Sequence, residues 1–438
     1  MEAGQETAAP HTSAPTQSVP DHGSNQYQTS DTLETSLSYL DLAPAPVVEQ
    51  ILNDWFEFVH PVAPILHRDT FLREFHDPNN APSSELSALV ISICSATVAT
   101  LRQRAAAYEE LVTVEKCFAL VQKHGYLQNS FSVSFRRAQI QYNCAVSIGQ
   151  MRGMDCPEAQ LLLSAATAAA GRMLHYDAEH MPFRDRELLK RLYLLCFAGQ
   201  CSSGLLARPY MIPSGVTNLE VVMPQVLNDA ELDMVTPGQE TWHGNVTSYI
   251  PGLRALTHIF ALWYRSQQGD CSDLQHLQKY VDLALTSLDD LPPQLRWRGG
   301  LSRPQRSNFG TDVQMVNLYI TQIHIRSFLM DQMHAVAKRQ NQTAIVDQIV
   351  VSRQALIDDM LAICYQSPEA ILEANGHSLI GKLRDIGMSL LEDETNPVQA
   401  FANLDRLLAK LDRLDVRRVG PIDSTSPLSF LTSPRSIP

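Results

Sequence analysis

The chain has 438 residues, 45% of them hydrophobic, and a formal net charge of −13 at pH 7. This length and apolar content favour a globular protein with a large buried core. The sequence contains no apolar run of the about 18 residues that a membrane helix needs, and its N-terminus lacks the features of a secretion signal, so we predict an unexported protein without membrane-spanning segments.

The first 43 residues have the composition of a disordered tail. They are rich in Ser, Thr, Gln, Pro, Gly and Asp, with almost no aliphatic residue before Leu33, so they cannot bury enough apolar surface to offset the entropy of ordering. Nine acidic residues and no Lys or Arg precede Arg68, which makes this end a poor partner for the phosphates of DNA. The leucines that alternate with acids between residues 32 and 42 fit either an activation segment or a linker that docks on the folded domain.

Ordered structure is predicted from residue 44 onward, and it is helical. Apolar residues recur at helical spacing from Val47 to Val59, and His60-Pro61 ends that helix. Further helices are predicted at about 69–76, 84–102, 105–124, 131–150, 156–175, 185–205, 248–266, 272–290, 310–338, 342–366, 368–392 and 397–414. The predicted N-caps are Asp69, Ser83 or Ser84, Ser130 and Asp185.

No run of alternating β-branched residues with hairpin signals interrupts these helices. We therefore predict an all-α fold, a large multi-helix antiparallel bundle over residues 44–415. Two segments with Pro and Gly, from Arg208 to about Gly244 and from Leu291 to Gly310, are predicted to be irregular and are candidate walls of a groove. Residues 416–438 return to the composition of a disordered tail, with Ser-Pro dipeptides at Ser426 and Ser433 as candidate phosphorylation sites.

The motifs that would bind phosphate or metal are incomplete. Gly376–Lys382 fits G-x-x-x-x-G-K, but Leu383 replaces the magnesium-binding Ser or Thr and no predicted strand precedes the motif. His175 and His180 are five residues apart, which is off the i, i+4 spacing that places two ligands on one helix face. The sequence therefore predicts neither a phosphate-binding loop nor a metal site here.

Histidine and cysteine side chains are interpreted as structural. His60 and His67 flank a Pro-rich turn, where we predict hydrogen bonds within the fold. The eight cysteines are scattered without a C-x-x-C pair and are read as small buried hydrophobes, with Cys196 and Cys201 among Leu, Tyr and Phe where a thiol is inert. A G-x-S-x-G nucleophile motif is absent. We predict no catalytic, cofactor-binding or metal-binding residue, no cofactor, and a protein that is not an enzyme.

Basic residues cluster at Arg136-Arg137, Arg184 to Arg191 and Lys410 to Arg418. Acidic residues are interspersed with them, which is typical of solvated helix faces rather than of a nucleic-acid contact. No aromatic residues are interleaved in the way that stacks single-stranded bases. The sequence offers no case for DNA recognition by this chain alone.

Four blocks of sequence carry a resemblance through their order and spacing along the chain. They run from Trp55 to Phe75, from Ala138 to His175, from Glu187 to Ile212 and from Leu291 to Leu329. Together they resemble the fungal-specific transcription factor domain, the regulatory middle region of zinc binuclear cluster transcription factors. The third block lacks the Trp and Asp that the family has there. The family's zinc cluster needs six closely spaced cysteines, and because none precedes Cys94, no such site can be built from this chain.

The resemblance implies a transcription regulator that acts in the nucleus on a metabolic gene set, with secondary metabolism as one candidate. DNA would be reached indirectly, through a partner or through a zinc-cluster domain encoded in a separate upstream exon. The transcription machinery and a small apolar effector are the other partners that the resemblance implies. The alternative is an all-α small-molecule-binding protein or enzyme without a role at DNA. A pocket lined by converging His, Asp or Glu would favour an enzyme, and a pocket lined by Leu, Met and Phe would favour an effector site.

Overall fold

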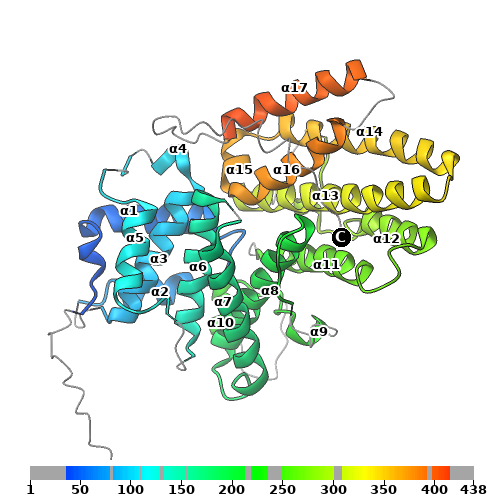
Figure 1. The fold of residues 1–438 in the computed structure, drawn as a ribbon. Helices are drawn as coiled ribbons and strands as arrows, with labels where there is room; N and C mark the ends of the chain where they lie inside the picture. Colours follow the sequence, from blue (N-terminus) through cyan, green and yellow to red (C-terminus); the bar gives the residue numbers. More distant parts are fainter. Residues whose placement is uncertain are drawn as a thin grey trace, which may run out of the picture. The chain divides into compact units, whose positions relative to one another are not determined.

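The structure is a computed structural model that describes residues 36–78, 82–105, 107–108, 110–128, 133–153, 155–212, 219–234, 248–299, 308–391 and 397–414. The chain divides into two units, Met1–Ser36 and Leu37–Pro438, and the fold described below belongs to the second. Its described residues form helices and no strand, which confirms the prediction of an all-α fold (Figure 1). Residues 1–35 of the predicted N-terminal tail, the whole predicted C-terminal tail (416–438) and Ser130 lie outside the described residues.

The folded unit begins earlier than predicted. The sequence predicts the start of the folded domain at residue 44, but Leu37 and Leu42 are each only 1% exposed. Between them the short helix η1 (Tyr39–Asp41) is capped by Ser38, and the Tyr39 ring packs 5.0 Å from that of Phe75, centroid to centroid. Two leucines buried in the core offset the cost of ordering so short a segment. Over residues 37–42, the chain therefore docks on the domain.

A helix and a proline turn follow. Helix α1 (Ala45–Asp54) continues into the π-helical turn η2 (Trp55–Val59), which the His60 N–H closes by donating to the Trp55 carbonyl at 2.8 Å. Pro61 then prevents continuation, so the predicted end at His60-Pro61 is confirmed. Helix α2 (Arg68–Phe75) is capped by His67, whose Nδ1 accepts from the Thr70 N–H at 3.3 Å. The predicted cap, Asp69, instead lies in the first turn.

The next helices build the N-terminal half of the core. They are α3 (Ser84–Thr100), α4 (Arg102–Ala105), α5 (Val114–Lys123), α6 (Phe135–Arg152) and α7 (Pro157–Tyr176). Helix α3 is buried from Leu86 to Thr100 because α1, α5 and α6 all pack against it. Several of its buried hydroxyl groups form hydrogen bonds within the fold, as in the Ser95–Ser147 hydroxyl pair at 2.9 Å.

Helix starts in this half follow side-chain caps. Ser83 caps α3 by accepting from the Leu86 N–H at 3.1 Å, so that prediction is confirmed. The single helix predicted at 105–124 is wrong, because Thr113 caps a separate helix, α5, by accepting from the Lys116 N–H at 3.2 Å. A threonine that caps α5 cannot also lie inside a continuous helix.

The C-terminal half contains longer helices. They are α8 (Phe183–Leu205), α9 (Leu219–Val222), α10 (Asp229–Met234), α11 (Ile250–Ser266), α12 (Leu274–Thr286), η4 (Pro293–Leu295), α13 (Phe309–Arg339), α14 (Thr343–Gln366), α15 (Glu369–Ala374), α16 (Gly376–Leu391) and α17 (Pro397–Leu414). Figure 1 shows α1 to α6 gathered on one side and α12 to α17 on the other, with α8 and α11 between them. Helix α8 packs on α7 and on α11, and α11 packs on α13, so the two halves share one core.

Three predictions in this half need correction. Asp185 does not cap α8, which begins after Pro182 without a side-chain cap. The segment predicted to be irregular from residue 208 contains the short helices α9 and α10. The helix predicted at 368–392 is interrupted, because Gly376 has a φ of +64° and starts a new helix after Asn375. Glycine adopts this left-handed conformation without the steric penalty of a Cβ atom.

Two glycines in helices provide a test of packing. Gly204 lies at the junction of α8 and α11, and Gly381, in α16, is the comparison. A Cβ on Gly204 would lie 2.3 Å from Cη2 of Trp263, a ring that is 2% exposed. We expect Gly204→Ala to lower the free energy of unfolding by about 1–3 kcal/mol, because the indole has no space to withdraw. At Gly381 the nearest atom would be 3.7 Å away, so Gly381→Ala should raise stability by up to about 1 kcal/mol through helix propensity. Urea unfolding of both variants measures this, and shifts of the same sign would contradict it.

Candidate functional site

A cavity of about 200 Å³ lies where the two halves of the core meet. We call it the central cavity. Its walls come from η2 and the turn after it, from α3, α6 and α7, from α8 and α11, and from α13, α15 and α16. Both halves of the fold therefore contribute to one site.

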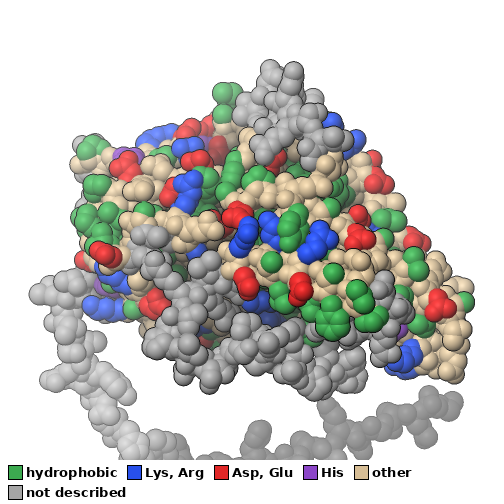
Figure 2. All heavy atoms as spheres, turned by 90° about the horizontal axis from the view of Figure 1, so that it is seen from above, with side chains coloured by type: hydrophobic (Ala, Val, Ile, Leu, Met, Phe, Trp, Pro, Cys, Tyr) green, Lys and Arg blue, Asp and Glu red, His purple; other side chains and the backbone are tan. Residues whose placement is uncertain are grey.

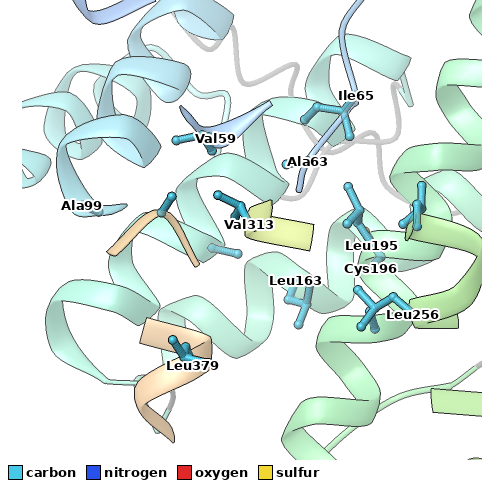
Figure 3. Close-up of a cluster of buried hydrophobic side chains, with 14 of the residues drawn as sticks. Val59, Ala63, Ile65, Ala99, Leu163, Leu195, Cys196, Leu256, Val313 and Leu379 are labelled. Carbon is cyan, nitrogen blue, oxygen red and sulfur yellow. The ribbon is translucent and has the colours of Figure 1, made fainter. Parts of the chain in front are cut away.

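Most of the wall is apolar. Val59, Ala63, Leu163, Leu195 and Leu256 line the cavity. They come from η2 and the turn after it and from α7, α8 and α11, and Figure 3 shows them with their neighbours. Residues this far apart in sequence are brought together by packing of whole helices. A site of this kind favours a ligand with an apolar body.

The polar part of the wall includes a buried lysine. Lys382 is 4% exposed, and its Nζ donates to Asn317 Oδ1 at 3.0 Å and to Thr321 Oγ1 at 2.7 Å. Its ammonium group also lies 5.9 Å from the centre of the Phe260 ring. Burial lowers the pKa of Lys382 from 10.5 to about 7, because an ammonium group in an apolar environment loses its hydration.

A buried asparagine lines the same cavity. Asn375 Nδ2 donates to the carbonyls of Val313 at 3.2 Å and Ile371 at 2.9 Å, which fixes the orientation of the amide. Asn375 Oδ1 is buried and accepts no hydrogen bond within the described part of the chain. A buried carbonyl oxygen of this kind favours contact with a ligand that carries a donor.

Few ionisable side chains occur among the described residues that line the cavity. Among the described residues that line it, none is His, Asp, Glu or Cys, and Tyr142 has a pKa raised by burial. The wall therefore matches neither of the two patterns expected from the sequence, since amides and one lysine accompany the apolar residues. Lys382 supplies the cationic group.

Sequence reasoning missed Lys382 as a site residue. The G-x-x-x-x-G-K motif that contains it lies within α16, and no strand precedes it in the described structure, so rejection of a phosphate-binding loop stands. The signal that could have identified Lys382 is its register. It follows Leu379 by three residues and precedes Ile386 by four, which places a charge on the apolar face of the helix.

Of the two histidines of the Pro-rich turn, His67 forms the predicted hydrogen bonds, whereas Nδ1 of His60 is buried without a hydrogen-bond partner among the described residues. His67 Nδ1 accepts from the Thr70 N–H, so its Nε2 carries the proton that it donates to the Asp229 carbonyl at 2.8 Å. His60 packs against the rings of Trp55 and Phe56, with centroids 5.2 and 5.5 Å away. The two imidazoles thus help to hold the turn against η2 and α10.

His60 is expected to make the fold sensitive to acid. Burial lowers its pKa from 6.5 to about 4, opposed in part by Asp229. Between these values the unfolded chain binds a proton that the folded chain does not, so stability falls as the pH falls. As the pH falls over this interval, the free energy of unfolding should decrease in the wild type by up to about 3 kcal/mol more than in His60→Leu. Urea unfolding at both ends of the interval measures the difference, and an equal loss in both proteins would contradict it.

The cysteines are buried, apart from the partly exposed Cys271. Burial raises the pKa of Cys196 to about 12 and that of Cys201 well above its ordinary value. Both thiols are therefore protonated and unreactive near neutral pH, which supports their interpretation as core residues. No group of three or more His, Cys, Asp or Glu positioned to hold a metal ion occurs in the described ranges.

The basic clusters are engaged within the fold. Arg136 pairs with Glu74, Arg184 donates to Thr70 Oγ1 at 3.0 Å, and Arg191 is buried. Figure 2 shows acidic and basic side chains interspersed on the face that it presents. Arg136 and Arg184 lie on helix faces as predicted, but Arg191 is buried rather than solvated, and residues 415–418 of the third cluster lie outside the described residues. None of the described helices is both long and apolar enough to cross a bilayer.

Comparison with known proteins gives one partial likeness. A segment of 42 residues is 36% identical to Cutinase transcription factor 1 alpha of Fusarium vanettenii. The segment is 10% of this chain and 5% of that protein. No protein-family model matches the chain, and no solved structure matches it. The comparison thus hints at a fungal transcription factor.

Proposed function

We propose that this protein is a transcription regulator of the fungal-specific type, that it acts in the nucleus, and that a small molecule in the central cavity controls it. The observation that carries the proposal is the partial match to a fungal transcription factor. The all-α fold and the four sequence blocks are consistent with it.

The central cavity supplies a physical route to control. Its wall joins α3 and α6 of one half to α13 and α16 of the other. A ligand that touches both halves binds more tightly to one relative placement of the helices than to another, and it shifts the population toward that placement. The wall carries no paired carboxylates or His among its described residues.

Contact with DNA is assigned to a partner or to a zinc-cluster domain. The acidic residues before Arg68 oppose direct contact with phosphates, and the described basic clusters are held in intramolecular bonds. Translation of the nucleotides upstream of the coding region in all frames would distinguish these two routes. A C-x-x-C motif followed by a Lys- and Arg-rich stretch would identify the second.

Two measurements test the proposal. Chromatin immunoprecipitation of the tagged chain, in cells that contain its partner, should enrich promoters of a metabolic gene set. Fusion of the full chain to an unrelated DNA-binding domain should change transcription of a reporter relative to that domain alone. Absence of both promoter enrichment and a reporter effect would overturn the proposal.

A further inference from the structure

We propose that the central cavity binds a small organic carboxylate, with the carboxylate paired to Lys382 and a ring-sized apolar body against the leucine-lined wall. The regulatory meaning of this ligand rests on the proposed function, but its binding can be tested separately. The inference stands on the placement of one cationic group in an otherwise uncharged cavity.

The hydrogen bonds of Lys382 leave one of its N–H groups available to an anion. A lysine ammonium has three donors, and two of them reach Asn317 Oδ1 and Thr321 Oγ1. Thr321 Oγ1 donates to the Asn317 carbonyl at 2.6 Å, so it accepts from Lys382. The third N–H has no partner among the described side chains, and it is the group that a bound carboxylate would engage.

Both protein partners of Lys382 are neutral. His324 and Asp385, on the same two helices, are bonded to each other at 2.7 Å, and Glu373 Oε1 on α15 accepts from the Gln103 N–H at 2.6 Å. No carboxylate in the described residues forms an ion pair with Lys382. Buried charges in proteins are normally compensated by an opposite charge, and here a ligand is the group that would supply it.

The size of the cavity and its second polar group, Asn375, restrict the class of ligand that it can bind. Its volume of about 200 Å³ exceeds the about 150 Å³ of an engineered apolar cavity that admits benzene, so one ring with a carboxylate is of suitable size. Asn375 lies seven residues before Lys382 and lines the same cavity, with its Oδ1 buried and unbonded. A hydroxyl or N–H group on the ligand would satisfy that oxygen.

The test uses the full-length protein and isothermal titration calorimetry. Benzoate is the carboxylate probe, and benzyl alcohol, of similar shape, is its neutral control. We expect benzoate to bind at least about tenfold more tightly than benzyl alcohol, because a charge-assisted hydrogen bond is formed only with the anion. Equal affinities, a preference for the alcohol, or no binding of either probe would overturn the proposal.

A matched pair of lysine variants locates the carboxylate. Lys382→Met should weaken benzoate binding by about tenfold or more while leaving benzyl alcohol within about twofold. Lys410→Met, at a lysine that is 8% exposed on α17 and outside the cavity wall, should leave both affinities within about twofold. If Lys382→Met does not fold, Lys382→Gln replaces it, and the comparison of probes on the wild type still decides the proposal.

Asn375 gives an independent outcome. A hydroxybenzoate whose hydroxyl reaches Asn375 Oδ1 should bind more tightly than benzoate, and Asn375→Leu should abolish that advantage. No advantage for either the 3- or the 4-hydroxy isomer would remove Asn375 from the site. Trapping of benzaldehyde on Lys382 by borohydride, without affinity for benzoate, would overturn the proposal and identify the lysine as an amine nucleophile.

The two proposals fail in different ways. Carboxylate binding that persists without promoter enrichment or a reporter effect would leave the cavity assignment intact and remove the transcriptional role. Promoter enrichment and a reporter response without carboxylate binding would support the transcriptional role and remove the cavity assignment.

Discussion

Replacing Arg191 by Ala is expected to lower the free energy of unfolding by about 3–5 kcal/mol, the largest loss that we predict for a single polar side chain in this fold. Arg191 is 1% exposed. Its guanidinium donates to the Pro64 carbonyl at 3.4 Å and to the Leu227 carbonyl at 3.2 Å, and it pairs with Asp229 at 3.6 Å. Burial lowers its pKa, while Asp229 and Glu187 oppose that effect.

The loss follows from the groups that would remain. Helix α8 holds the segment before α10 through two residues four apart, since Glu187 Oε2 also accepts from the Gln225 N–H at 2.6 Å. Without Arg191, two buried carbonyls lose a donor and Asp229 loses its buried counter-charge, and each such group carries a desolvation cost.

Urea unfolding of Arg191→Ala beside Arg172→Ala measures the effect. Arg172 forms an exposed ion pair with Asp177 at 3.1 Å, and surface pairs of this type contribute at most about 1 kcal/mol. Similar losses in the two variants would show that the buried guanidinium is not what holds the proline turn to α8.

Lys382→Met is expected to raise the free energy of unfolding by about 1–4 kcal/mol near neutral pH, because a buried charge is replaced by an apolar side chain of similar length. The sign follows from proton binding. The pKa of Lys382 is about 7 in the folded protein and 10.5 in the unfolded chain, so between these values the unfolded chain binds the extra proton. Wild-type stability therefore rises with pH over this interval, by at most about 1.4 kcal/mol per pH unit.

The methionine variant should lack this rise, so its advantage is full below about pH 7 and declines toward about pH 10. Urea unfolding across that range gives the slope. Ser378→Ala, one turn earlier in α16 and without an ionisable group, should keep the wild-type slope. A Lys382→Met protein that is less stable than the wild type at every pH would show that the bonds to Asn317 and Thr321 outweigh the cost of burying the charge.

Replacement of Lys382 by Met is thus expected to raise stability and to lower the affinity for the carboxylate. The variant that gains stability is the one that should lose the carboxylate. Residues that lower stability while they provide a binding group are typical of functional sites. An increase in stability together with a loss of benzoate affinity would mark Lys382 as a ligand-binding residue rather than a packing residue.

Several helix boundaries could be predicted because their causes are local. Ser83 begins α3 by bonding three residues ahead, and Pro61 ends the first helical segment because it lacks an N–H. The periodic apolar residues of the long helices predicted the all-α class, because helical periodicity is also a short-range property of the sequence. The interruption at Gly376 is also local, but a glycine within an apolar helical pattern does not by itself show which conformation it takes.

The helical class, most helix positions and the buried state of most cysteines could thus be predicted, since they follow from residue periodicity and short-range bonds. The burial of Leu37 and Leu42 in the core and the place of Lys382 in the cavity wall depend on long-range packing instead. Lys382 meets its partners Asn317 and Thr321 across 65 and 61 residues of sequence. Contacts at such separations depend on how α13 packs against α16, which the spacing of residues along either helix does not specify.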